Sequence, residues 1–294
     1  MSDSDLDQTG APKRHDFYNG DEPDWSDIVT DLDAPLERTT RILGRIRDDR
    51  RGTPRGAFQR VYCLVGEPGE AKSSCMLRIG RELIVDGYDV YLYQGLDKLD
   101  IDTTVWWIQR RPKTALLVDN AADHAETIGQ LCERAKALSR DLLIVGAERA
   151  RRLNRVLEGV AADILCAPEV TNVRFLSDAD IQAVIRKLSD KVRLGPLTRA
   201  SRDERKRYFQ REHNRQLFPA LIGLGATSLR DRVVAELDQL SDPSLRDAYV
   251  ITSVASHLGA PIPLGVLAAA TGLPGKEIAS QVLSSNGKLG DVCV

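Results

Sequence analysis

The fold of this chain is decided by residues 61–73, VYCLVGEPGEAKS. The apolar, β-branched run at 61–65 predicts a buried strand, which must end at the Gly-Glu-Pro-Gly sequence of 66–69. Lys72 and Ser73 then begin a predicted helix. A strand, a glycine loop, Lys-Ser and a helix in this order are typical of a phosphate-binding loop, in which backbone N–H groups and a helix N-terminus surround phosphate oxygens.

Each residue type in such a loop has a chemical task. The lysine, here Lys72, contacts the β- and γ-phosphates, and the serine hydroxyl, here Ser73, coordinates Mg²⁺. The residues predicted to bind the nucleotide are Gly66, Glu67, Pro68, Gly69, Glu70, Ala71, Lys72, Ser73 and Ser74. The pattern G-x-x-x-x-G-K-[ST] is broken at Ala71, which adds a Cβ beside the phosphates and is expected to give up access to positive φ.

The sequence after the loop favours a nucleotide site over an ordinary strand-to-helix turn. Residues 73–85 carry apolar side chains at helical spacing, as a helix packed on a sheet requires. A second motif follows at 114–120, TALLVDN, where an apolar strand ends in Asp119. Because ligands gather at the carboxyl ends of parallel strands, Asp119 is expected beside the loop, where it would help to organise Mg²⁺.

Asn120 indicates slow hydrolysis. Many ATPases of this kind carry a carboxylate directly after the magnesium acid, whereas an amide orients a water molecule but cannot take its proton. Asp123, Glu126 and Glu148 are the alternative sources of a base, and the sequence does not choose among them.

Arg149 follows a further predicted strand at 141–146, DLLIVG. An arginine just beyond the carboxyl end of a strand near the nucleotide can contact the γ-phosphate. The neighbouring Arg151, Arg152 and Arg155 leave an equal alternative, in which Arg149 is a salt-bridged surface residue of a basic segment. The predicted catalytic set is Lys72, Asp119, Asn120 and Arg149, with Ser73 and Asp119 at the metal.

The alternation of strands and helices predicts the fold class. Strands are expected at 61–65, 88–93, 114–119, 141–146 and 172–175, with helices between them. This pattern is typical of an α/β fold of the P-loop NTPase type, a parallel sheet sandwiched by helices. An all-α lid and a winged-helix-like helical domain are expected to follow. The predicted regions are a disordered leader at 1–34, the nucleotide-binding domain at 35–175, the lid at 176–241 and the winged-helix-like domain at 242–294.

The last region reads as three short helices, at 244–258, 264–271 and 275–283, separated by Gly/Pro turns. In a DNA-binding unit the third would be the recognition helix, but Lys276 is its single basic residue. A packing module is therefore favoured. Residues 288–294 resemble the start of a wing strand, so either the wing is abbreviated or the sequence belongs to a longer polypeptide.

Composition narrows the class of protein. Of 294 residues, 42% are hydrophobic, as in ordinary globular proteins. The net charge of −2 argues against nucleic-acid binding over the whole surface. The five cysteines form no C-x-x-C pair, so reduced structural thiols are expected rather than a metal site or a disulfide frame. The sequence shows neither a signal peptide nor an apolar run of membrane-spanning length, and a cytoplasmic location is the default expectation.

Four parts of the sequence carry a family resemblance: GEPGEAKS, ALLVDNAAD, LLIVGAER, and the helical region from HNRQLF to AYVITSVASHLGAPIPLGVLAAATG. Together they resemble the STAND class of signal-transducing P-loop NTPases, particularly the prokaryotic novel STAND type. The resemblance covers roughly residues 35–290. It implies an ATP/ADP- and Mg²⁺-dependent switch, closed with ADP, opened by exchange to ATP and then self-associating. Lys72, Ser73, Asp119 and Arg149 match the family's phosphate, Mg²⁺ and γ-phosphate-sensing positions.

Many members act in bacterial signalling or antiphage defence, joined to effector and sensor domains. Two residues depart from the family's usual pattern, Ala71 in the loop and Asn120 after the magnesium acid. We also recognise no effector domain before residue 35, no sensor repeats after residue 290 and no counterpart of the family's winged-helix histidine. Two alternatives to the switch stay open: a DNA-associated AAA+-like initiator or loader, and a scaffold that has kept the fold but binds no nucleotide. Nucleic acid is therefore a possible but not a favoured partner.

Overall fold

We describe the protein from a computed structural model. It describes residues 16–19, 23–53, 58–67, 69–93, 99–166, 169–170 and 176–225, and in the C-terminal part 234, 237–238, 240, 242–258 and 262–281. The chain divides into two compact units, Phe17–Gly225, and Met1–Asp16 together with Ala226–Val294. Each unit is treated by itself below, and the four predicted domain boundaries stay predictions.

The first unit is built on a parallel sheet with the strand order β2-β3-β4-β1-β5. The strands are β1 (Gln59–Val65), β2 (Asp89–Tyr93), β3 (Lys113–Val118), β4 (Asp141–Glu148) and β5 (Glu169–Val170). β1 lies between β4 and β5, so the strand that leads into the glycine loop is buried inside the sheet. This burial explains why its sequence is a nearly continuous apolar run.

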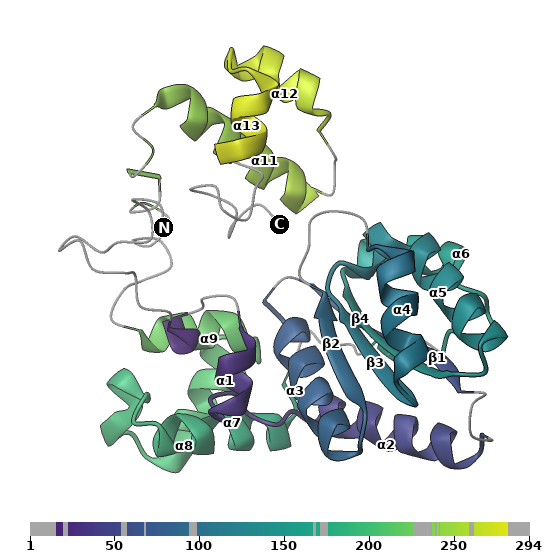
Figure 1. The fold of residues 1–294 in the computed structure, drawn as a ribbon. Coiled ribbons are helices and arrows are strands. Elements are labelled where there is room, and N and C mark those ends of the chain that lie inside the picture. Colours follow the sequence, from purple (N-terminus) through teal and green to yellow (C-terminus); the bar gives the residue numbers. More distant parts are fainter. Residues whose placement is uncertain are drawn as a thin grey trace. The chain divides into compact units, whose positions relative to one another are not determined.

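Helices cover both faces of the sheet (Figure 1). On one side lie α2 (Glu37–Arg51) and α3 (Lys72–Val85), and on the other α4 (Ile101–Arg110), α5 (Ala125–Ala137) and α6 (Leu153–Gly159). Consecutive strand residues serve opposite faces: Leu117 belongs to the core with α3, and Leu116 to the core with α5. The predicted α/β class, a parallel sheet between helices followed by a helical region, is confirmed.

The fifth strand of the sheet is short. β5 is Glu169–Val170 and pairs with Leu64 and Val65 of β1, whereas the predicted strand at 172–175 lies outside the described residues.

The interpretation of residues 1–34 as a disordered leader is wrong for residues 23–34. Helix α1 (Trp25–Val29) begins with a capping box between Asp24 and Asp27, and Ile28 is fully buried. Asp33 then makes a bidentate ion pair with Arg78 of α3, at 2.6 and 2.9 Å. A polar composition therefore concealed a segment held by tertiary contacts.

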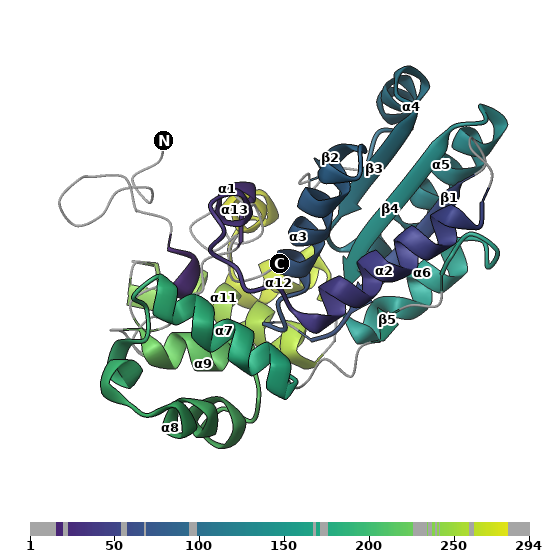
Figure 2. The ribbon, with the colours of Figure 1, turned by 90° about the horizontal axis from the view of Figure 1, so that it is seen from below.

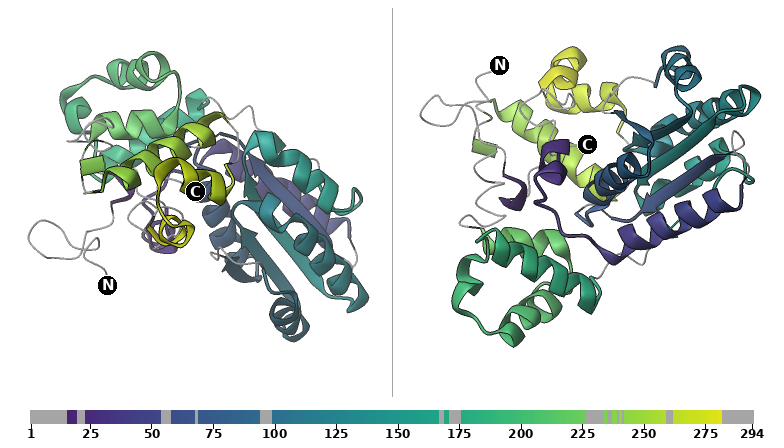
Figure 3. Two further views of the ribbon diagram at one scale, coloured as in Figure 1. Left: turned by 90° about the horizontal axis from the view of Figure 1, so that it is seen from above. Right: turned by 60° about the horizontal axis from the view of Figure 1, so that its bottom comes forward.

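The helical part that follows the sheet is formed by α7 (Asp178–Asp190), η5 (Gly195–Arg199), α8 (Arg202–Arg207), the π-helix η6 (Tyr208–Glu212) and α9 (Leu217–Leu224), which we call the lid. Figures 2 and 3 show α7, α8 and α9 as a group separate from the helices that cover the sheet. Within the lid, Ser201 and Glu204 form a capping box that starts α8.

The second unit contains α11 (Pro243–Leu258), α12 (Leu264–Thr271) and α13 (Gly275–Gln281), at the positions that the sequence predicts. They enclose a small core of Leu240, Leu245, Ala248, Tyr249, Leu267 and Ile278. Gly272 ends α12 with a φ of 72°, a conformation that glycine adopts without strain. The predicted wing strand at 288–294 lies outside the described residues.

Candidate nucleotide-binding site

The hydroxyl of Ser73 and the carboxylate of Asp119 meet at the carboxyl edge of the sheet. Ser73 is the second residue of α3, and its Oγ donates to Asp119 Oδ2 over 2.7 Å. Asp119 follows β3, which is separated from β1 by β4 alone. Its other oxygen, Oδ1, accepts the N–H of Asn120 over 2.8 Å, which fixes the orientation of the carboxylate.

This oxygen pair has the chemistry that a magnesium ion requires. Mg²⁺ takes hard oxygen ligands in near-octahedral geometry and keeps several water molecules. A serine hydroxyl and a carboxylate oxygen lying 2.7 Å apart supply one direct and one water-mediated ligand without further side chains. The residues predicted to hold the metal are thus brought together, and Ser73 and Asp119 fit Mg²⁺.

The loop that carries Lys72 is folded as a tight turn. Lys72 Nζ donates to the backbone oxygen of Glu67 over 2.8 Å, which holds the side chain along the loop. Gly69 has a φ of 78° and Ala71 a φ of 55°, both in the left-handed region. The expectation that Ala71 gives up positive φ is therefore wrong: the alanine adopts the glycine conformation at a cost of about 1–2 kcal/mol.

Glu70 folds back across the same loop. Its Oε2 accepts the N–H of Glu67 over 2.8 Å, and a Cβ at Gly66 would overlap this carboxylate. A side chain at position 66 would therefore require the carboxylate of Glu70 to move. Pro68, the remaining predicted loop residue, lies outside the described residues.

Two cations, Lys72 and Arg149, lie among several carboxylates at the site. Burial lowers the pKa of Lys72, the charges of Asp119 and Glu70 raise it, and that of Arg149 lowers it. The pKa of Arg149 is lowered by burial and by Arg151 and Arg152. Lys72 and Arg149 are thus close enough to repel each other, which a polyanion between them would relieve. Arg149 follows β4, where the sequence predicts it.

The three candidate bases have other roles in the structure. Asp123 pairs with Arg152, and Glu126 is exposed and accepts a hydrogen bond from Gln130. Glu148 is buried with both carboxylate oxygens accepting backbone N–H groups, from Ala122 and Arg149. These contacts give the three carboxylates other partners, and the role of Asn120 in slow hydrolysis stays a prediction.

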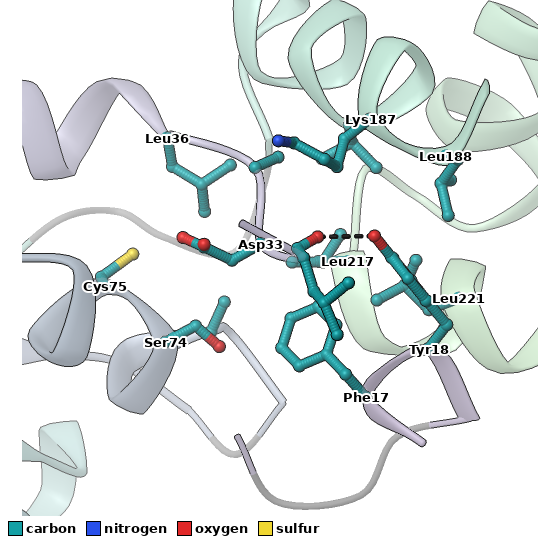
Figure 4. A pocket seen from close by; sticks show the side chains of 14 residues that line it. Phe17, Tyr18, Asp33, Leu36, Ser74, Cys75, Lys187, Leu188, Leu217 and Leu221 are labelled. Atoms are coloured by element: carbon teal, nitrogen blue, oxygen red, sulfur yellow. Dashed lines mark hydrogen bonds between the residues drawn. The ribbon is translucent and has the colours of Figure 1, made fainter. Parts of the chain in front are cut away.

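An apolar pocket adjoins the loop (Figure 4). It is partly open to solvent, and its walls are mostly apolar. Its walls come from five separated stretches: Phe17 and Tyr18; Leu32, Asp33, Ala34 and Leu36; Ala71, Ser74 and Cys75; Val184, Lys187 and Leu188; and Leu217 and Leu221. Ala71 and Ser74 flank Lys72 and Ser73, so the apolar pocket and the phosphate loop share the first turn of α3.

Ion pairs hold the walls of the apolar pocket together. Asp31 forms salt bridges with Arg78 of α3 (2.7 Å) and with Lys187 of α7 (2.5 Å). Lys191, one turn further along α7, donates to the backbone oxygen of Thr30. The N-terminal segment is therefore tied both to the phosphate-loop helix and to the lid.

The lid also contacts the loop directly. Phe218 of α9 lies over Gly69, with its Cβ 3.0 Å from the position that a Cβ on Gly69 would take. Arg215, near the start of α9, donates to the backbone oxygen of Leu176 and pairs with Asp178. Arg215 thus has a packing role, whereas Phe218 is the lid residue at the loop.

Sequence reasoning missed the apolar pocket, the ion pairs of Asp31 and the position of Phe218. The pocket residues have no common pattern, because they are brought together from stretches up to about 200 residues apart. Glu148 was considered only as a base, although it lies two residues beyond the predicted strand at 141–146, just as Asp119 lies at the end of another. The position of an acid at a strand end was thus the available signal, and its burial decided its role.

Residues 15–160 match the family described as Novel STAND NTPase 5. The chain carries a Novel STAND NTPase 5 domain. It is thus a STAND-type P-loop NTPase, and the family implies nucleotide binding. The matched stretch contains Lys72, Ser73, Asp119 and Arg149, but it ends before the lid residues of the apolar pocket.

Three solved structures are distantly similar. They are a RuvB variant from Thermotoga maritima (15% identity, TM-score 0.37, covering 84% of this chain and 85% of that chain), a DNA replication initiation factor (14%, 0.36, 77% and 72%) and AMPPCP-bound DnaA from Aquifex aeolicus (13%, 0.33, 83% and 86%). At this distance the similarities identify no activity or partner. No curated protein matches the sequence. Among the described residues, no helix combines the length and apolar character needed to cross a bilayer.

Proposed function

We propose that this STAND domain is an ATP-binding switch with slow hydrolysis, in which exchange of ADP for ATP moves the lid and drives self-association. The observation that carries this proposal is the position of the site. The phosphate loop, Asp119 and Arg149 belong to the sheet domain, while Val184, Lys187, Leu217 and Leu221 of the lid close the adjoining apolar pocket.

A nucleotide in this position contacts two parts of the unit at once. Its phosphates would lie against Lys72 and a magnesium ion held by Ser73 and Asp119, and its base would enter the apolar pocket. A ligand shifts a conformational equilibrium only by its differential affinity for the two states. The γ-phosphate, facing Arg149 and the Phe218 side of the loop, is the group that would distinguish ATP from ADP.

Slow hydrolysis suits a switch of this kind, because a bound triphosphate must persist while the protein assembles. Asn120 supplies no base, and the nearby carboxylates are engaged elsewhere. A role in bacterial signalling or antiphage defence belongs to the same proposal, as do effector and sensor partners.

The test is binding of Mg²⁺-ADP and Mg²⁺-ATP by thermal shift and calorimetry, with sedimentation to follow assembly. Both nucleotides should raise the melting temperature, since a ligand selective for the native state stabilises it. Lys72→Ala should weaken ATP binding by about 10- to 100-fold, the worth of a charge-assisted phosphate contact. Lys136→Ala, at an exposed position of α5, is the matched control.

ATP but not ADP should increase the sedimenting mass. Failure of either nucleotide to stabilise the protein would contradict the proposal and favour a scaffold that binds no nucleotide. Salt-dependent binding of duplex DNA without self-association would favour the initiator or loader alternative.

A further inference from the structure

Glu148 is a charged residue in the interior of the sheet domain. It is the last residue of β4, its side chain has no exposed surface, and it lies opposite Val65 in the register of β4 with β1. Burying an ionisable side chain destabilises the folded state unless each of its polar atoms has a hydrogen-bond partner.

The hydrogen bonds of Glu148 reach three segments of the candidate site. Its backbone oxygen accepts the N–H of Gly66, the first residue of the phosphate loop, over 3.1 Å. Its Oε2 accepts the N–H of Ala122 over 2.7 Å, and its Oε1 accepts the N–H of Arg149 over 2.7 Å. Ala122 belongs to the turn η3 (Ala121–His124), directly after Asp119 and Asn120.

The two carboxylate bonds differ in function from the backbone bond. The backbone bond joins the loop to β4 and does not depend on the side chain. The carboxylate bonds position η3 and Arg149, the elements that carry the residues proposed to sense or process the γ-phosphate. Arg152 Nε, 3.8 Å from Oε1, is too far for a direct hydrogen bond but contributes positive charge.

We propose that Glu148 is a positioning residue that sets Asn120 and Arg149 for the γ-phosphate while leaving the rest of the phosphate site unaffected. Because both oxygens are occupied by backbone N–H groups, Glu148 is not the general base. The proposal rests on the nucleotide-binding function proposed above.

The experiment compares the affinities of Mg²⁺-ATP and Mg²⁺-ADP in the full chain and in Glu148→Gln. Glutamine has the same shape but replaces one acceptor oxygen by a donor, so one buried N–H loses its partner. The preference for ATP over ADP should fall about tenfold, with the dissociation constant for ADP within about twofold of the original protein. Glu158→Gln, at an exposed position of α6, is the matched control and should change neither constant.

An unchanged preference would overturn the proposal, and so would an equal loss for both nucleotides, which is the result expected of a purely structural residue. If the original protein binds neither nucleotide, the proposed function itself fails, and this outcome is distinct from both. Should Glu148→Gln not fold, amide exchange in the original protein decides. Ala122 and Arg149 should exchange more slowly with ATP than with ADP, and equal rates would refute the assignment.

Discussion

The two ends of the proposed nucleotide site are built differently. The phosphate end uses one contiguous stretch, residues 66–74, together with Asp119 and Arg149 from the ends of two strands. The apolar pocket uses five stretches between Phe17 and Leu221, and most of its lining atoms are apolar. Backbone N–H groups and a helix N-terminus serve the first end, whereas side-chain packing and distant ion pairs serve the second.

Because of this difference, we expect that substitutions can alter one end of the site without altering the other. A phosphate contact depends on local loop geometry, which a short sequence determines. The apolar pocket depends on how the N-terminal segment and the lid pack on α3, which Asp31 and Asp33 stabilise. Substitutions in the pocket should therefore affect binding of the nucleoside, and substitutions in the loop should affect binding of the polyphosphate.

The largest effect is expected from filling the apolar pocket. Ala34, in its wall, is half-buried, and Ala34→Phe would place a ring where we propose the base binds. The loss of apolar contact should cost about 2–3 kcal/mol, or about 30- to 100-fold in ATP affinity. Calorimetry with Mg²⁺-ATP and with Mg²⁺-tripolyphosphate checks this, because tripolyphosphate has no base and should bind as before.

Ala34→Ser is the control for this substitution, since it changes polarity without filling the pocket. Equal losses for ATP and tripolyphosphate would show that the two ends cannot be separated. An unchanged ATP affinity would mean that the base binds elsewhere.

Asp31→Asn should weaken the attachment of the N-terminal segment to the lid. Hydrogen bonds from Lys187 and then Arg78 hold the pKa of Asp31 well below its usual range. Its contribution to stability is therefore present above the pKa of the unfolded chain, near 4, and is lost as the pH falls below that value. Because the side chain is about half exposed, we expect a loss of about 1 kcal/mol at pH 7.

Urea unfolding between pH 3 and 8 measures this difference. The original protein and Asp31→Asn should converge toward the acid end, whereas Asp190→Asn, at the exposed end of α7, should follow the original protein throughout. A gap that persists undiminished at pH 3 would rule out the ion pairs as its source.

Glu70→Gln tests the phosphate end alone. The carboxylate of Glu70 lies near enough to Lys72 to raise the pKa of that lysine, so it opposes an incoming polyphosphate. The amide keeps an acceptor for the N–H of Glu67 but removes the charge. Affinity for both ATP and tripolyphosphate should rise about threefold, and the gain should shrink with added salt.

Glu67→Gln is the control in the same loop, because the side chain of Glu67 is exposed. A similar gain in both variants would assign the effect to the net charge of the loop. A loss in Glu70→Gln would assign Glu70 a supporting role in the loop.

The smallest effect is expected at Ala71, which belongs to both ends. Ala71→Gly removes the strain of an alanine in the left-handed conformation, about 1–2 kcal/mol. Against this gain, glycine loses more conformational entropy on folding and lacks the packing of the alanine methyl group. A net gain of about 0.5 kcal/mol, or a rise of about 1–2 °C in melting temperature, should follow. Ala137→Gly, at the end of α5 with ordinary helical backbone, should lower the melting temperature instead.

The sequence by itself determined the α/β alternation, the phosphate loop and the acid at the end of β3. These features depend on local patterns: a period of two, a glycine turn and an apolar strand ending in Asp119. It did not predict that Ala71 adopts a positive φ, because the surrounding packing rather than the preference of the residue imposes that angle.

Three features became visible only in the tertiary structure. They are the ordered conformation of residues 23–34, the apolar pocket and the buried position of Glu148. Asp31, Asp33 and Glu148 look like ordinary surface acids in the sequence. Their roles arise when Arg78, Lys187 and the N–H groups of other segments are brought to them by burial of apolar surface. An ion pair or buried hydrogen bond between distant residues leaves no periodic pattern, since its strength depends on burial and geometry that the folded chain alone supplies.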